Sequence, residues 1–256
     1  MNIQVLGAHN CEAQEYKLSS LLIDGVLAMD AGGLTSSLSL SAQRKLKAIL
    51  LTHHHYDHIR DIPALAMNFL LDENTIIVYS ISPVYDALVT HLTNGRLYPN
   101  FLERPPGKPV IQFSVMEPGK SRQIDGYDVM AVEVKHSCPA VGYQVMSPGG
   151  KAVFYTGDTG PGLADCWKYV SPRLLIMELT APDRYEDFAW EKGHLTPKLL
   201  KEELISFRKL KGYLPRVVLV HMNPRLKKEI AGEIADVARA LGVSIDLAYE
   251  GMLLDL

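Results

Sequence analysis

A run of histidines directly after a short apolar segment constrains this chain more than any other feature. Residues 48–51 are all apolar and typical of a buried strand, and Thr52-His53-His54-His55-Tyr56-Asp57-His58 follows at once. Four imidazoles and a carboxylate this close together are too costly to bury without partners. A metal is the natural partner, because a loop at a strand's end can present His53 and His55 to one ion and Asp57 and His58 to a second.

Three more metal-competent residues share a position at the end of an apolar segment. These are His136 after residues 129–134, Asp158 in Thr156-Gly157-Asp158-Thr159-Gly160 after residues 152–155, and His221 after residues 217–220. Strand ends at one edge of a sheet commonly build a binding site, so one rim can collect all these groups. Two four-coordinate ions that share one bridging carboxylate need seven protein ligands, and the sequence offers that number.

Apolar runs and helical spacing give the remaining order of elements. Strands are predicted at residues 3–6, 21–23, 26–29, 48–51, 75–79, 110–116, 129–134, 141–146, 152–155, 174–177, 216–220 and 243–248. Helices are predicted at residues 62–71, 83–92, from Pro197 through Phe207, and at 224–241. Asp24-Gly25 predicts a hairpin turn, and the three prolines in residues 103–109 predict an internal loop. This order fits two sheets packed face to face with helices outside.

Composition narrows the class of protein. The chain has 256 residues, 47% of them hydrophobic, and a net charge of −3, which gives no general attraction for a polyanion. Its three cysteines lie far apart without a CxxC pair, which excludes a disulfide framework and a zinc ribbon. No segment approaches the roughly 20 apolar residues of a spanning helix. We expect a cytoplasmic protein in a reducing compartment, not anchored to a membrane.

The ordered set His53-His54-His55-Tyr56-Asp57-His58, His136, Asp158 and His221 resembles the HxHxDH, His, Asp, His signature of the metallo-β-lactamase superfamily. The resemblance covers nearly the whole chain. It implies an α/β (α+β) fold, a four-layer αββα sandwich of two mixed sheets, with residues 1–256 as one domain. It also implies two divalent metal ions, Zn²⁺ or else Mn²⁺ or Fe. His53, His55 and His136 would hold one ion, Asp57, His58 and His221 the other, and Asp158 would bridge them.

A second cluster bears on the substrate. Glu178 ends an apolar segment, and His194 lies just before Thr196-Pro197, which predict a helix start. His194 is either a solvent-facing residue before the helix or a contact for an anionic substrate oxygen, oriented by Glu178. The pair resembles the phosphodiesterase branch of the superfamily, which includes ribonuclease Z and the class II cyclic-nucleotide phosphodiesterases. Residues 193–204 and 91–101 look more like the latter.

We therefore expect a metal-dependent phosphodiesterase that hydrolyses a small phosphodiester, a 3′,5′-cyclic nucleotide such as cyclic AMP, by attack of a metal-bridging hydroxide. Asp57 would position the nucleophile, and His194 would stabilise charge or protonate the leaving group. A ribonuclease Z-like activity on tRNA is less favoured. That family has a His where this chain has Met177, and a tRNA-gripping arm where only 21 residues separate His136 from Asp158.

Two more functions are compatible with the same ligands. Thioester or lactone hydrolysis on the dinuclear site would leave His194 without an obvious role, and a metal-binding sensor would not need the full ligand set. A homodimer is compatible with the sequence. Several residues are expected to be bystanders or pocket-rim residues: His54, Tyr56, His91, a rim residue His9, a small buried Cys138, and the aromatics Tyr98, Trp167 and Trp190.

Overall fold

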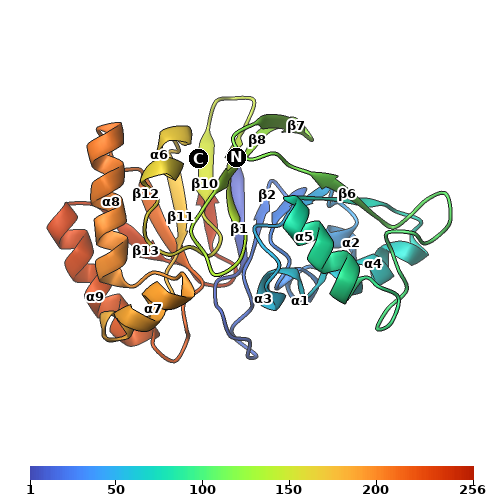
Figure 1. Ribbon diagram of the computed structural model, residues 1–256, viewed down its shortest axis with the longest axis horizontal. Helices are drawn as coiled ribbons and strands as arrows, with labels where there is room; N and C mark the ends of the chain where they lie inside the picture. Colours follow the sequence, from blue (N-terminus) through green and yellow to red (C-terminus); the bar gives the residue numbers. More distant parts are fainter.

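Two mixed β-sheets of seven strands each form the centre of the molecule (Figure 1). The computed structural model describes residues 1–256, apart from the side chain of Leu71. The first sheet has the strand order β14 (Leu253–Asp255), β1 (Asn2–Gly7), β2 (Ser20–Ile23), β3 (Leu27–Met29), β4 (Ala48–Leu50), β5 (Ile76–Ser80) and β6 (Ile111–Val115). The second has the order β13 (Ile245–Leu247), β12 (Arg216–Val220), β11 (Leu174–Glu178), β10 (Ala152–Tyr155), β9 (Val141–Met146), β8 (Tyr127–Glu133) and β7 (Ser121–Ile124).

Both sheets are antiparallel on one side and parallel on the other. Strands β14 to β3 pair antiparallel and β3 to β6 parallel, while β7 to β10 pair antiparallel and β10 to β13 parallel. Parallel strands place their carboxyl ends at one edge, so the loops after β4, β10 and β12 start from such edges. These three loops carry the histidine run, Asp158 and His221.

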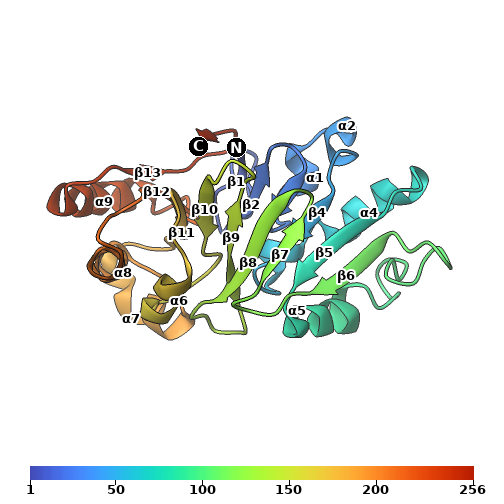
Figure 2. The same ribbon diagram turned by 90° about the horizontal axis from the view of Figure 1, so that it is seen from above.

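Helices cover the outer faces of both sheets, as Figures 1 and 2 show. On the first sheet's side lie α1 (Leu34–Ser37), α2 (Leu40–Gln43), α4 (Ile62–Leu71), α5 (Ser82–Ala87) and the π-helical turn η1 (Leu88–Leu92). On the second sheet's side lie α6 (Ala164–Tyr169), the 3₁₀ turn η2 (Asp183–Tyr185), α7 (Glu186–Lys192), α8 (Pro197–Lys211) and α9 (Lys227–Leu241). The short α3 (Tyr56–Ile59) belongs to the loop after β4. The arrangement is the αββα sandwich that the sequence predicts.

The core explains why residues 217–220 of β12 are all apolar. Val218 and Val220 pack into the cluster shared with the first sheet, whereas Val217 and Leu219 pack with residues of α8 and α9. Successive strand residues face opposite sides, so a strand with both faces buried needs apolar residues at every position.

Several predicted boundaries shift. The Asp24-Gly25 turn between β2 and β3 is confirmed, with positive φ at both residues. The helix predicted at 83–92 is present, but it becomes π-helical from Leu88. The helix predicted from about Pro224 to Leu241 is also present and begins later, at Lys227. The last predicted strand, 243–248, is shorter, at Ile245–Leu247. The sequence analysis did not predict α1, α2, α3, α6, α7, η2, β7 or β14.

Within the described residues, no helix combines the length and apolar character needed to cross a bilayer. The organisation of residues 1–256 as one domain stays a prediction.

Candidate metal centre

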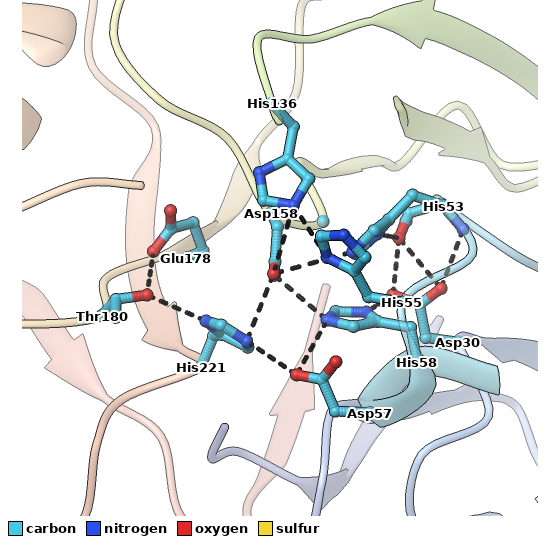
Figure 3. A network of polar contacts seen from close by, with 12 residues as sticks. Asp30, His53, His55, Asp57, His58, His136, Asp158, Glu178, Thr180 and His221 are labelled. Atoms are coloured by element: carbon cyan, nitrogen blue, oxygen red, sulfur yellow. Dashed lines mark hydrogen bonds and ion pairs between the residues drawn. The ribbon is translucent and has the colours of Figure 1, made fainter. Parts of the chain in front are cut away.

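Side chains from both sheets converge on one small region, which Figure 3 shows from close by. They form two groups, and the possible ligand atoms within each group lie within 4.8 Å of one another. The first group, the histidine half, consists of His53, His55, His136 and Cys138. The second, the carboxylate half, consists of Asp57, His58, Asp158 and His221. The seven residues expected as metal ligands are all in these groups.

The histidine run is anchored from behind by Asp30, which follows β3. Its buried carboxylate accepts hydrogen bonds from the Thr52 backbone N–H at 2.8 Å, the Thr52 hydroxyl at 2.9 Å and the Tyr155 hydroxyl at 2.8 Å. The Asp30 Oδ2 to His58 Nδ1 distance is 2.7 Å. Asp30 thus connects the loop after β4 to the second sheet through Tyr155, and the sequence analysis missed it.

These contacts fix which nitrogen of each imidazole faces the cluster. The Thr52 hydroxyl gives its proton to Asp30, so it accepts the Nδ1–H of His53 at 3.0 Å. His58 likewise donates Nδ1–H to Asp30. The Nε2 atoms of His53 and His58 are therefore the ones that face the cluster, where each could bind a metal once it is deprotonated. They lie 3.8 Å and 3.2 Å from the carboxylate of Asp158.

Two contacts orient the ligands from the second sheet. His136 Nδ1 donates to the Gly193 carbonyl at 2.8 Å, which directs Nε2 to within 3.1 Å of His55 Nδ1. Gly193 ends α7 with φ of 74°, and a Cβ there would lie 2.8 Å from the Cα of His136. The position therefore requires glycine. His221 contacts the Thr180 hydroxyl through Nδ1 at 3.0 Å, and its Nε2 faces Asp57 at 3.2 Å.

Glu178 and His194 form a pair beside the two groups. Glu178, fully buried at the end of β11, accepts hydrogen bonds from the Leu195 N–H at 3.0 Å and the Thr180 hydroxyl at 3.0 Å. His194 Nδ1 lies 3.1 Å from the same carboxylate, and its ring stacks on that of His221 at 5.4 Å. A ligand atom of His194 also lies within 4.8 Å of one on His136 and one on Asp158. The side chain of His194 is thus mostly covered and lies against Glu178, and the roles of the two residues stay predictions.

Neighbouring charges shift the pKa values of several groups in the centre. Burial favours the neutral acid, but His58 and His221 outweigh it and lower the pKa of Asp57 to about 2. The same two imidazoles, against burial, lower the pKa of Asp158 well below its ordinary value. Burial disfavours the imidazolium of His194, yet the Glu178 carboxylate raises the pKa of His194 to about 9. The centre thus holds ionised carboxylates beside a cationic histidine.

Three buried ligand atoms show that these residues fit a metal. His53 Nε2, His58 Nε2 and Asp158 Oδ1 have no hydrogen-bond partner among the described residues. Orphaned buried polar atoms cost about 1–3 kcal/mol each, so three of them in one cluster call for an ion. Imidazole and carboxylate donors suit a divalent transition metal.

A cavity of about 700 Å³ opens beside His136, a volume typical of small-molecule sites. Lys135, Ser137 and Cys138 line it on the His136 loop. Three acidic residues, Glu117, Glu133 and Asp165, also line it.

The residues expected to be bystanders differ in outcome. His54 belongs to neither metal group, and Tyr56 is exposed. Trp167 is fully buried in the core beneath α8, whereas Trp190 is exposed. His9 is fully buried beside the strand end that carries His221, with Nδ1 2.7 Å from Glu250.

The structure corrects the expectation that Cys138 is a small buried residue. It is half-buried and lines the cavity, and its Sγ lies within 4.8 Å of a nitrogen on each of His53, His55 and His136. The expectation of a small buried residue was wrong because it rested on a signature that contains no thiolate. The spacing from His136 was the only sequence signal.

Comparison with known proteins supports the fold and family. Residues 20–222 match the family model described as Beta-lactamase superfamily domain, so the chain belongs to this superfamily. The crystal structure of unliganded yeast PDE1 superposes with a TM-score of 0.84 at 17% identity, over 100% of this chain and 99% of that one.

Proteins similar to this chain in sequence include ribonucleases Z and a cyclic-nucleotide phosphodiesterase. Ribonuclease Z from Pyrococcus abyssi is 33% identical over 103 residues, which are 39% of this chain and 30% of that enzyme. Ribonuclease Z from Methanosarcina acetivorans is 23% identical over 75% of both chains. A 3′,5′-cyclic-nucleotide phosphodiesterase from Candida albicans is 25% identical over 36% of this chain and 20% of its own length. The chain is thus a hydrolase of the metallo-β-lactamase fold, a family that implies divalent ions at the His/Asp cluster.

Proposed function

We propose that the protein is a metal-dependent phosphodiesterase acting on a small phosphodiester, most specifically a 3′,5′-cyclic nucleotide. The observation that carries this proposal is the Glu178–His194 pair beside the metal groups. A cationic imidazole there meets the anionic oxygens of a phosphodiester, which an ester or lactone substrate does not carry. His194 also has the proton that a leaving alkoxide needs.

The proposed metal ligands are shared between two ions, along the same division as the two groups. His53, His55 and His136 would hold one divalent ion, Asp57, His58 and His221 the other, with Asp158 between them. When bound, two Zn²⁺ ions would supply a hydroxide nucleophile at neutral pH and positive charge for the phosphate. Asp57, held ionised by its neighbours, would orient the attacking water and accept its hydrogen bond. Glu178 would keep the His194 ring turned toward the substrate.

The cavity beside His136 favours a small substrate over tRNA. Glu117, Glu133 and Asp165 line it, and their carboxylates repel a polyanionic backbone but can accept the amino groups of a base. The segment between His136 and Asp158 consists of β9, β10 and a tight turn, with no room for an arm.

Ribonuclease Z activity remains the second candidate, because a ribonuclease Z matches over 75% of this chain. Thioester hydrolysis has no comparable support.

The test is the hydrolysis rate of 3′,5′-cyclic AMP by zinc-loaded protein, beside a chelated sample and a tRNA precursor with a 3′ extension. We expect turnover of cyclic AMP that chelation removes, and no tRNA cleavage. Cleavage of the precursor alone would transfer the protein to the second candidate, and inactivity on both substrates with two ions bound would reject phosphodiester chemistry.

A further inference from the structure

Cys138 lies where a metal ligand would lie. The loop after β8 carries His136 and, two residues on, Cys138, so both side chains leave the same short segment. The Cys138 Sγ is within 4.8 Å of one nitrogen on each of His53, His55 and His136, and these nitrogens are equally close to one another. One of them, His53 Nε2, is fully buried without a hydrogen-bond partner among the described residues.

Three imidazoles and one thiol form a donor set that zinc accepts. Asp158 then belongs to the carboxylate half, the group in which it lies, and a fifth position on the ion stays open for the hydroxide. With bonds of about 2.0–2.3 Å, tetrahedral geometry places ligand atoms about 3.5 Å apart. His136 Nε2 and His55 Nδ1 are already 3.1 Å apart, and the other donor atoms of the group lie within 4.8 Å, so an ion would draw them closer. The other two cysteines do not compete for this role: Cys11 is exposed, and Cys166 is buried beneath α8.

We propose that the Cys138 thiolate is a ligand of the ion held by the histidine half, an inference that rests on the metal centre proposed above. On binding, the S–H proton passes to solvent and the sulfur donates a lone pair to the ion. Thiolate ligation favours Zn²⁺ over Mn²⁺ and Mg²⁺, which prefer oxygen ligands. The histidine half is therefore selective for zinc.

The test is the absorption spectrum of the cobalt-loaded protein with its metal content. Cobalt bound to a thiolate gives an intense near-ultraviolet charge-transfer band that imidazole and carboxylate ligands do not give. We expect the band in the wild type, its loss in Cys138→Ser with two ions still bound, and its retention in Cys11→Ser, the matched control at an exposed thiol.

The possible results distinguish a failure of the proposed thiolate ligand from a failure of the proposed metal centre. Two bound cobalt ions without the band, or a band that survives in Cys138→Ser, would overturn the thiolate ligand and leave the metal centre standing. A wild-type protein that binds no cobalt would overturn the centre and the ligand together.

A second measurement does not need the variant to fold. Alkylation of wild-type thiols, followed by mass spectrometry, should be at least about tenfold slower at Cys138 with zinc bound than after chelation. Cys11 should react at the same rate in both samples. Equal reactivity of Cys138 with and without zinc would contradict the proposal.

Discussion

The two halves of the metal cluster are built from similar donors but supported differently. In the carboxylate half, His58 is backed by the buried Asp30 and His221 by Thr180. In the histidine half, His53 contacts a hydroxyl and His136 a backbone carbonyl. Among these four imidazoles only His58 has a carboxylate directly behind its ring, and that anion makes it the stronger ligand.

Backbone strain follows the same division. Asp30 has φ of 58° and His221 has φ of 65°, both in the left-handed region that costs non-glycine residues about 1–2 kcal/mol. None of His53, His55, His136 and Cys138 is found with positive φ. The strained backbone therefore makes the carboxylate half more costly in free energy to fold than the histidine half. Such a cost fits a site whose ion positions reacting groups. The histidine half binds its ion with less strain.

Replacing Asp57 with Ala should have the largest effect on this contrast. The carboxylate half loses an ionised ligand and the group proposed to orient the nucleophile, so hydrolysis of cyclic AMP should fall at least about 10³-fold. Metal content should fall from two ions toward one, because the histidine half is unchanged. Asp86→Ala, at an exposed position on α5, is the control. Full turnover with two ions retained would reject the assigned role of Asp57.

His194→Gln should separate catalysis from metal binding in both halves. Without an imidazole that can carry a proton, turnover should drop about 10²-fold, while the number of bound ions stays at two. Single-turnover rates and metal content measured on one preparation decide this. Lys192→Gln, an exposed change on the neighbouring α7, serves as the matched control. Unaltered turnover would remove the proton-donor assignment, and loss of an ion would make His194 a ligand instead.

The sequence singled out the residues that the structure gathers into the two groups, because each of them follows an apolar strand. Those strands are buried, so their pattern is strong, and their ends mark where a polar side chain needs a partner. The supporting residues carry no such signal. Asp30 and Thr180 are ordinary polar residues between apolar segments, and only the folded structure places them behind His58 and His221.

The missed elements are those without an apolar pattern of their own. Strand β7 is an edge strand with three exposed residues, Ser121, Arg122 and Gln123, so no alternation marks it. Helix α7 buries only Ala189 and exposes Phe188 and Trp190. Packing against neighbouring elements stabilises both, because tertiary contacts decide the structure where the local preference of the sequence is weak.

Asp30→Asn should weaken the carboxylate half more than the histidine half, because Asp30 contacts His58 directly and His53 only through Thr52. The amide keeps the shape of the side chain but removes the charge that backs His58, so affinity for one of two ions should fall about 10- to 100-fold. Tyr155→Phe removes one hydrogen bond to Asp30 and keeps its charge, so it should change affinity much less. Calorimetric zinc titration resolves the two sites. Equal weakening of both ions in Asp30→Asn would break the distinction between the halves.

The smallest expected effect concerns the support behind His221. The next residue, Met222, pairs through its backbone with Ala8 and Asn10, and Glu250 anchors that segment by accepting the Ala8 and Lys17 N–H groups. Burial favours the neutral acid, but the contacts with His9 and the Lys17 N–H lower the pKa of Glu250 below its ordinary value of 4.5. The ionised carboxylate is therefore worth more to the folded state than to the unfolded one.

Glu250→Gln should accordingly lower the free energy of unfolding at pH 7 by about 1 kcal/mol. Because the folded pKa is depressed, this contribution is fully present above pH 4.5 and is lost as the pH falls through the folded value. The wild type and variant should thus converge in urea unfolding on the acid side. Glu15→Gln, exposed in the same segment, should match the wild type throughout. A gap between wild type and Glu250→Gln that stays constant down to acid pH would show that shape and not charge supports His221.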